Sequence, residues 1–373
     1  MIRISHIPAI LALLCLSPAL AQDSPTAPET DKMSSEEREK WTALQIFLDD
    51  AGFHPGKIDG RWGSFTARAL ERHQRAEGKS DATFGDEKPE DLPVDTDSVS
   101  PVFTTYTITE EDVDFIGSLP DEPVDQAKEE RMPYTSLAEL AAEKFHTDLD
   151  YFRELNEGVD IDALKTGDSV TVPNVGSVFS LADVKPEDGN DEDAEGDEGS
   201  AEGAEESGED AEGSAEGAAG DEEAGEDAEG SAEGDEDKDL RIEISTTEKV
   251  LEVYAGDALA ATYPVTPGSE TLPAPKGEWE VTSVTWMPTF RWDKQMLEKG
   301  ERSEEAHILP PGPNSPVGIV WIAIDKDGIG IHGTAAPDDI GRTSSHGCIR
   351  LSNWDAWDLG NRVAAGTPVI IRD

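Results

Sequence analysis

The stretch TSSHGCIRL, at residues 343–351, contains the side chains best suited to covalent chemistry. Cys348 follows Gly347, and Arg350 stands two positions later. A thiol acts as a nucleophile when its pKa is lowered, a base takes its proton and donors stabilise the oxyanion that it creates. A lone cysteine can also be a buried, unreactive small hydrophobe, so its neighbours decide between the two interpretations.

A candidate base stands at the end of an apolar run upstream. The residues IGI at 329–331 predict a strand that ends at His332, and Cys348 begins the run CIRL. Two strand ends in one sheet can bring the imidazole and the thiol within hydrogen-bond reach. The amides of Gly347 and Cys348 are candidate oxyanion donors. Arg350 points to the same face of its strand as Cys348 and can hold a carboxylate bidentately.

Two other interpretations of these side chains remain open. His332, His346 and Cys348 are all zinc-ligand types, but a closed zinc site takes four ligands. The sequence has no cysteine pair or His-Glu motif that completes such a site. Either histidine can instead be a hydrogen-bonded residue of the core.

The start of the chain predicts export. Arg3 precedes an apolar run at residues 7–16, and Ala19-Leu-Ala21 is the small-x-small pattern of a cleavage site, so residues 1–21 are interpreted as a signal peptide. Cys15 lies inside it, which leaves Cys348 without a disulfide partner in the mature protein. No later stretch reaches the roughly 20 apolar residues of a transmembrane segment. We therefore expect an exported protein that is periplasmic or extracellular; the resemblances described below imply a periplasmic location at the cell wall.

The chain has a strongly negative net charge, and much of it is concentrated in one segment. The net charge of −52 argues against nucleic acid and anionic membrane surfaces as partners. Between positions 186 and 237 there are 25 Asp and Glu and no Lys or Arg, in a background of Gly, Ala and Ser. Such a composition predicts a disordered acidic linker at residues 186–238, around which the C-terminal domain could move relative to an N-terminal anchor. The alternative is that the carboxylates bind divalent cations and fold the segment.

Residues 35–80 predict a small all-α domain. Helical spacing of apolar residues in WTALQIFL, from Trp41, is broken at Gly52 and resumes from Phe65 to Gln74. This segment resembles the peptidoglycan-binding domain found on many wall enzymes. The alternative is that it is a packing and spacer unit that binds nothing. The residues that match the domain's pattern are Asp59, Gly60, Gly63, Thr66, Ala69, Leu70 and Gln74, while His73 stands where phenylalanine is usual.

Residues 132–175 predict a second, α+β module. Leu137, Leu140 and Phe145 share one helical face, a second helix ends near Asn156, and SVTVP at 169–173 is a closing strand. The order of elements and the ending Gly-Asp-x-Val-x-Val-Pro-Asn are similar to a LysM module, which binds N-acetylglucosamine-containing glycans. The usual opening of that module is missing, so a degenerate spacer is an equal alternative.

Residues 239–373 predict a mostly-β domain. Alternating or apolar runs at 240–244, 250–254, 317–324, 329–332 and 368–371 are typical of strands. One helix follows the capping-box-like start at Ser352, and Gly366 stands where a helix stop is expected.

The C-terminal motif carries a specific resemblance. The triplet from His332 to Thr334, followed after a loop by Ser345-His-Gly-Cys-Ile-Arg350, resembles the signature of the L,D-transpeptidase (YkuD-type) catalytic domain, a sandwich-like fold. The resemblance implies that Cys348 is the nucleophile and His332 its base and acid. It implies supporting roles for the remaining motif residues: Gly333 or Thr334 orienting the imidazole, Gly347 at the oxyanion, and Arg350, His346 and Ser345 shaping the substrate pocket.

The same resemblance implies the reaction. The thiol attacks the carbonyl that joins meso-diaminopimelate to the terminal D-alanine of a tetrapeptide stem, and the thioester passes to an amine acceptor. The acceptor is another stem, which gives a 3–3 cross-link, or a lysine of an outer-membrane protein; water gives L,D-carboxypeptidase-type trimming. The expectation is a multidomain monomer that needs no cofactor, acts on stem peptides and glycan strands, and serves cell-wall biogenesis and cell shape. The alternatives are a catalytically silent wall-binding scaffold and a zinc-dependent wall hydrolase.

Overall fold

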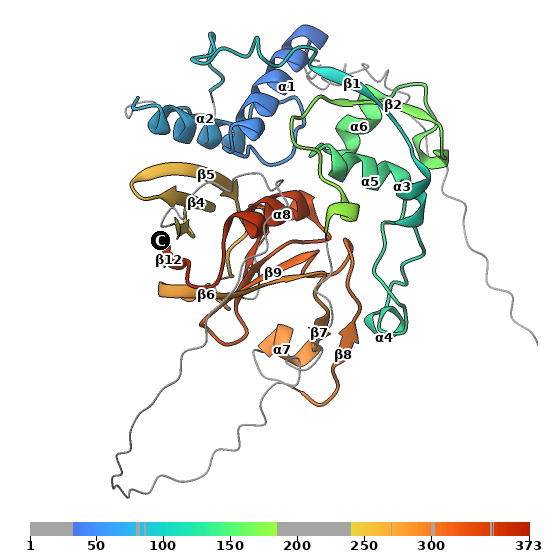
Figure 1. Ribbon diagram of the computed structural model, residues 1–373, viewed down its shortest axis with the longest axis vertical. Helices are drawn as coiled ribbons and strands as arrows, with labels where there is room; N and C mark the ends of the chain where they lie inside the picture. The colour runs from blue at the N-terminus through green and yellow to red at the C-terminus, as the bar shows by residue number, and fades with distance from the viewer. Residues whose placement is uncertain are drawn as a thin grey trace, which may run out of the picture.

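The chain forms three folded parts in sequence order, shown in a computed structural model (Figure 1). The predicted signal peptide at 1–21, the acidic linker at 186–238 and His346 lie outside the described residues. No helix within the described part of the chain is long and apolar enough to cross a membrane. The described residues are 33–79, 83–85, 87–184, 240–269, 271–299, 303–343, 345 and 347–373.

The first part is the predicted pair of helices, α1 (Ser35–Asp50) and α2 (Ser64–Ala76). The turn between them is held by Gln45, whose side-chain oxygen accepts hydrogen bonds from the amides of Asp59 and Gly60 at 3.1 and 2.8 Å. Gly60 has φ +64°, in the left-handed region that glycine tolerates best. His73, at the usual phenylalanine position, still acts as an aromatic side chain, since its ring lies 5.2 Å from those of Phe47 and Phe53.

The second part contains the predicted helices α5 (Leu137–Lys144) and α6 (Leu149–Leu155) and the predicted strand β2 (Ser169–Pro173). The partner of β2 is β1 (Phe103–Thr107), which pairs with it antiparallel and lies upstream of the start expected at residue 132. The LysM-like module, as named here, is therefore residues 101–184. Its other elements are α3 (Glu110–Asp114), α4 (Pro123–Gln126), η1 (Ile161–Ala163) and η2 (Leu181–Asp183).

The third part is the predicted mostly-β domain, built on one eight-stranded sheet with the order β11-β10-β9-β6-β12-β3-β4-β5. The long strand β6 joins two halves of the sheet, because its first residues pair with β12 and its last residues with β9, with a bulge between Val281 and Ser283. Bulges let a sheet bend. The strands are β3 (Leu240–Ser245), β4 (Val250–Ala255), β5 (Ala258–Pro264), β6 (Gly277–Trp286), β9 (Val320–Ile324), β10 (Gly330–His332), β11 (Ile349–Arg350) and β12 (Pro368–Arg372).

The two ends of this sheet approach each other. Thr266, just beyond β5, exchanges backbone hydrogen bonds of 2.9 and 3.0 Å with Arg350 of β11. Ser345 likewise bonds the backbone of Pro267 and Ser269. The curled sheet therefore closes into the sandwich-like body that the resemblance implies.

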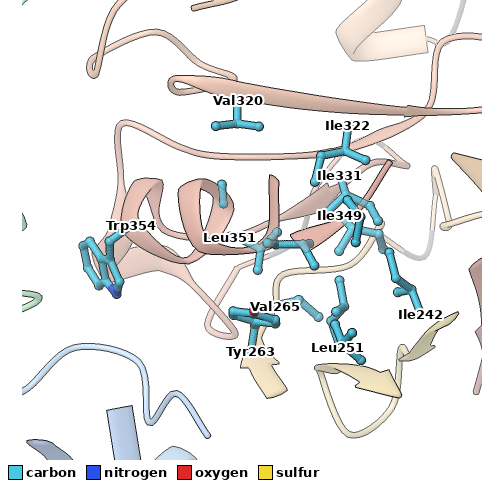
Figure 2. Packing of buried hydrophobic residues seen from close by; sticks show 14 of the residues in the cluster. Ile242, Leu251, Tyr263, Val265, Val320, Ile322, Ile331, Ile349, Leu351 and Trp354 are labelled. Atoms are coloured by element: carbon cyan, nitrogen blue, oxygen red, sulfur yellow. The ribbon is translucent and has the colours of Figure 1, made fainter. Parts of the chain in front are cut away.

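Helix α8 (Asn353–Arg362) packs inside the curl of the sheet (Figure 2). Ser352 caps it as predicted, because its side chain accepts a hydrogen bond of 3.2 Å from the amide of Asp355. Around it lie fully or almost fully buried side chains of the strands, and burial of such apolar area is the main force that holds the domain together. The labelled residues of this core are Ile242, Leu251, Tyr263, Val265, Val320, Ile322, Ile331, Ile349, Leu351 and Trp354.

The insertion between β6 and β9 was not predicted from the sequence. It holds the two-stranded pair β7 (Phe290–Trp292) and β8 (His307–Leu309) and the short helix α7 (Lys294–Lys299). Strands of three residues carry too little alternation to be recognised in a sequence.

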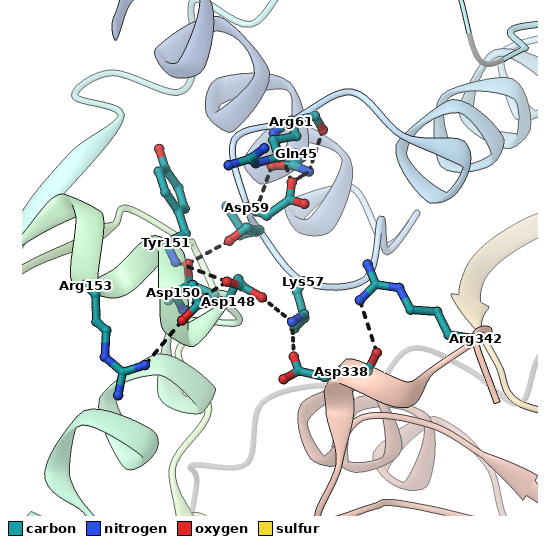
Figure 3. Close-up of polar contacts among 12 residues, drawn as sticks. Gln45, Lys57, Asp59, Arg61, Asp148, Asp150, Tyr151, Arg153, Asp338 and Arg342 are labelled. Atoms are coloured by element: carbon teal, nitrogen blue, oxygen red, sulfur yellow. Dashed lines mark hydrogen bonds and ion pairs between the residues drawn. The ribbon is translucent and has the colours of Figure 1, made fainter. Parts of the chain in front are cut away.

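The three parts are docked on one another. Lys57, in the turn of the first part, forms ion pairs with Asp148 of the LysM-like module and Asp338 of the catalytic domain (Figure 3). His54 is buried beside α8, with its ring nitrogens 3.0 Å from an Asp355 oxygen and 3.3 Å from an Asp358 oxygen. The expectation that the catalytic domain moves freely around an N-terminal anchor does not agree with these contacts.

Candidate active site

Strands β10 and β11 are parallel neighbours, with Ile331 opposite Ile349 and His332 opposite Arg350. Cys348 directly precedes β11, so in this register it lies level with Gly330, two residues before His332, and the alternation of side chains along a strand puts Cys348 and Arg350 on one face. The structure brings His332, Cys348, Arg350 and Ser345 together on one cavity of about 670 Å³. All four side chains line this cavity, but among the described residues no hydrogen bond joins the His332 imidazole to the Cys348 thiol.

His332 is held in one orientation. Its Nδ1 lies 2.7 Å from the carbonyl oxygen of Gly333, and its ring stacks on Trp321 at a centroid distance of 5.3 Å and an interplanar angle of 15°. Since the carbonyl only accepts, Nδ1 carries the proton and Nε2 keeps its lone pair. Burial lowers the pKa of His332 to about 4, and the Arg350 charge adds to this effect. The imidazole is therefore neutral near pH 7 and able to take a proton at Nε2.

The thiol of Cys348 is also neutral. Burial raises its pKa, and the Gly330 backbone and the Arg350 charge offset only part of that effect. The Sγ atom lies 3.7 Å from the carbonyl oxygen of Gly328, a weak contact. A lowered thiol pKa was expected from the sequence, and the structure gives the opposite direction because partial burial of the side chain disfavours the thiolate. The site therefore holds a neutral thiol beside a neutral imidazole.

The turn before Cys348 is fixed by Ser345. Its hydroxyl donates to the carbonyl of Cys348 and accepts from the amide of Gly347 at 3.3 Å. Gly347 has φ +112°, a conformation that other residues rarely adopt, and a Cβ there would lie 3.0 Å from Ile329 Cδ1. Of the two expected oxyanion donors, the Gly347 amide is thus already shared with Ser345.

Arg350 presents a positive charge to the cavity. Its Nε is buried without a hydrogen-bond partner, and within the described part of the chain its guanidinium forms no ion pair with a carboxylate. Burial lowers its pKa, but an arginine remains protonated at any physiological pH. A partly buried, unpaired cation favours an anionic group of a ligand beside it.

The remaining motif residues are placed differently. Thr334 is buried, its hydroxyl accepts from the amide of Ala336 at 3.2 Å, and it is not among the described residues that line the cavity. The Gly333 carbonyl, not Thr334, therefore orients His332. A Cβ on Gly333 would lie 2.4 Å from Asn353 Oδ1, so the position leaves no room for a larger residue. The motif residue His346 lies outside the described part.

The walls of the cavity were missed by sequence reasoning. Beside Trp321, they include Phe290 and Trp292 of β7 and Val317, so the cavity is mainly apolar and aromatic. The signal that was overlooked is the aromatic density of WMPTFRW at residues 286–292. Among the described residues, no group of three or more His, Cys, Asp or Glu side chains is arranged to hold a metal ion.

Known proteins resemble the chain in two regions. Residues 239–371 match the model of the L,D-transpeptidase catalytic domain, and residues 37–80 match that of a putative peptidoglycan binding domain. The putative L,D-transpeptidase YkuD of Bacillus licheniformis is 31% identical over 131 residues, which are 35% of this chain and 64% of that protein. The probable L,D-transpeptidase YbiS of Escherichia coli is 36% identical over 94 residues, 25% of this chain and 30% of that protein.

Among solved structures, an L,D-transpeptidase from Mycobacterium smegmatis aligns with 19% identity and a TM-score of 0.30, over 36% of this chain and 59% of that one. The chain spans less than two thirds of the length of the curated relatives described above. By these comparisons, residues 239–371 are similar to the L,D-transpeptidase catalytic domain family, and residues 37–80 to the family of putative peptidoglycan-binding domains.

Proposed function

We propose that the protein is a peptidoglycan L,D-transpeptidase whose nucleophile is Cys348. The observation that carries the proposal is the shared cavity of Cys348, His332 and Arg350, in which the imidazole is neutral and its Nδ1 is already bonded to Gly333. A thiol, a base with a free Nε2 and an unpaired cation are the groups that acyl transfer from a carboxylate-bearing peptide needs.

In the first step, Nε2 of His332 takes the Cys348 proton as sulfur attacks the carbonyl between diaminopimelate and the terminal D-alanine of a tetrapeptide stem. The tetrahedral oxyanion receives hydrogen bonds from the turn amides before β11. The C–N bond then breaks, the imidazolium returns its proton to the leaving amine, and D-alanine departs. Arg350 binds a stem carboxylate and holds the scissile bond against the sulfur.

In the second step, an acceptor amine attacks the thioester while Nε2 of His332 takes its proton. The C–S bond breaks and the imidazolium reprotonates the leaving sulfur of Cys348, so the enzyme returns to its neutral pair. An amine of another stem gives a 3–3 cross-link, and a lysine of an outer-membrane protein gives a covalent tether. Both outcomes take place at the cell wall of the periplasm, with residues 37–80 and the LysM-like module in contact with it.

The test is a reaction of the purified protein with tetrapeptide muropeptides, followed by mass spectrometry of protein and products. We expect an adduct on Cys348 equal to the stem minus D-alanine, and cross-linked dimers. Cys348→Ala should abolish both, and His332→Ala should slow the adduct strongly.

Other products identify the alternatives. Tripeptides alone would indicate L,D-carboxypeptidase-type trimming with water as acceptor. The absence of any adduct on Cys348 would contradict the proposal in favour of a wall-binding scaffold, and activity lost to a chelator would favour a zinc-dependent hydrolase.

A further inference from the structure

Asn353, the first residue of α8, lies directly behind the peptide that orients His332. It is fully buried, and its Oδ1 occupies the space that a Cβ would take on Gly333, at 2.4 Å, or on Gly318, at 2.0 Å. The Gly333 amide donates to the carbonyl of Val320 at 3.2 Å. The Gly333 peptide is thus held by a hydrogen bond to β9 on one side, and the Asn353 carboxamide packs against it, without a hydrogen bond, on the other.

The carboxamide is itself held by another module. Asn353 Nδ2 donates to Glu143 Oε1 at 2.9 Å and to the Pro313 carbonyl at 3.1 Å, while Oδ1 accepts from the Ile319 amide at 3.3 Å. Glu143 lies on α5 of the LysM-like module, is buried, and also accepts from the Tyr134 hydroxyl at 2.7 Å. Burial raises the pKa of Glu143 to about 7, so near neutral pH the group is a mixture of acid and carboxylate, and Oε1 accepts hydrogen bonds in either form.

The same module also holds the segment that leads to the cavity wall. The amide of Met132 donates to the Pro311 carbonyl at 2.8 Å, and its carbonyl accepts from the Asn314 amide at 3.2 Å. Asn314 Nδ2 donates to Glu139 Oε1 at 2.9 Å. The chain then continues to Val317, which lines the active-site cavity. Contacts of the LysM-like module therefore reach Asn353, which packs against Gly333, and the segment that leads to the cavity wall.

We propose that Glu143 and Asn353 are positioning residues for His332, so that docking of the LysM-like module completes the active site of the catalytic domain. This inference rests on the proposed function and extends it. Glu143 holds the carboxamide of Asn353, the carboxamide holds the Gly333 peptide, and the Gly333 carbonyl keeps the proton on Nδ1 and the lone pair on Nε2. Without Glu143, the carboxamide turns, the Gly333 carbonyl tilts and the base loses its fixed tautomer.

The test compares three variants of the full chain. Glu143→Leu keeps a side chain of similar volume but removes the acceptor. Glu143→Gln is the conservative variant, since its Oε1 still accepts from Asn353 and Tyr134. Arg72→Met is the matched control: it breaks a 2.9 Å hydrogen bond to buried Glu252 between α2 and β4, an interface with no contact to Gly333.

Two measurements distinguish a loss of His332 positioning from a general loosening of the domain interfaces. The first is the rate constant of Cys348 acylation by a carbapenem at saturation, and the second is the pair of ring ¹⁵N shifts of His332 in the protein alone. We expect Glu143→Leu to slow acylation by on the order of 10- to 100-fold and to give a mixture of tautomers. Glu143→Gln and Arg72→Met should stay within about threefold of the wild type and keep the Nδ1–H form.

Several outcomes overturn the inference. One is a normal rate and a single tautomer in Glu143→Leu; another is equal slowing in Glu143→Leu and Arg72→Met. If Glu143→Leu does not fold, Asn353→Ala replaces it: we expect the same slower acylation and mixture of tautomers, and a normal rate with a single tautomer would overturn the inference. If the wild type itself forms no acyl-enzyme, the proposed function fails, whereas the tautomer readout still decides the positioning role.

Discussion

The neutral state of His332 leads to a measurable pH profile. A buried imidazole whose pKa is about 4 stays unprotonated well below pH 6.5, the ordinary midpoint of a histidine. Lowering the pH from about 7 to about 5 should therefore leave close to 90% of the molecules with a competent base, against roughly 3% for an ordinary histidine. The two cases differ by about 30-fold in the expected acylation rate at pH 5.

The assay is stopped-flow acylation of Cys348 by a carbapenem at concentrations well below saturation, because the profile then reports the free enzyme. We expect a flat rate constant from about pH 8 down to about pH 5 and a fall whose midpoint lies near pH 4. Circular dichroism at each pH shows whether a lower rate comes from protonation of His332 or from acid unfolding of the protein. A midpoint at about pH 6 or above in the folded protein would refute the neutral-imidazole reasoning.

Three further predictions follow from single contacts. Gly333→Ala should push its new Cβ against Asn353 and lower the free energy of unfolding by about 1–3 kcal/mol, measured by urea denaturation; an unchanged stability would mean that the carboxamide moves away freely. Arg350→Lys should reduce turnover by about tenfold or more, since a point ammonium does not replace a planar fork of two charge-assisted bonds. Near-normal turnover would mean that only the positive charge at position 350 matters and that the bidentate contact is absent. Burial by itself lowers the pKa of His54, but Asp355 and neighbouring aspartates outweigh it and raise the pKa well above its usual value. Stability from His54 is thus full below about pH 6.5 and is lost as the pH rises through the raised pKa, so the urea midpoint should fall on the alkaline side, and His54→Gln should flatten that fall.

The order of the three folded parts and most of their helices and strands could be predicted from local patterns in the sequence. Helical spacing gave α1, α2 and α5, alternation gave β3, β4 and β12, and the cap at Ser352 gave the start of α8. These signals are local, because periodicity and capping depend on residues within one or two turns. That Cys348 and His332 share one cavity could also be expected from the sequence, since both residue types stand beside short apolar runs that pair in one sheet.

The protonation states of Cys348 and His332, and the contacts that position them, depend on how distant parts of the chain pack together. The direction of the Cys348 pKa depends on burial, which is set by side chains distant in sequence, and so sequence reasoning gave the wrong direction. In the sequence, Glu143 is an ordinary helix residue and Asn353 is part of a helix start. Their side chains meet only because the LysM-like module docks on the C-terminal domain. Charge composition predicted separated parts, whereas buried pairs such as His54 with Asp355 join them. Such contacts depend on how two surfaces are placed relative to each other in space, and a local sequence pattern does not encode this placement.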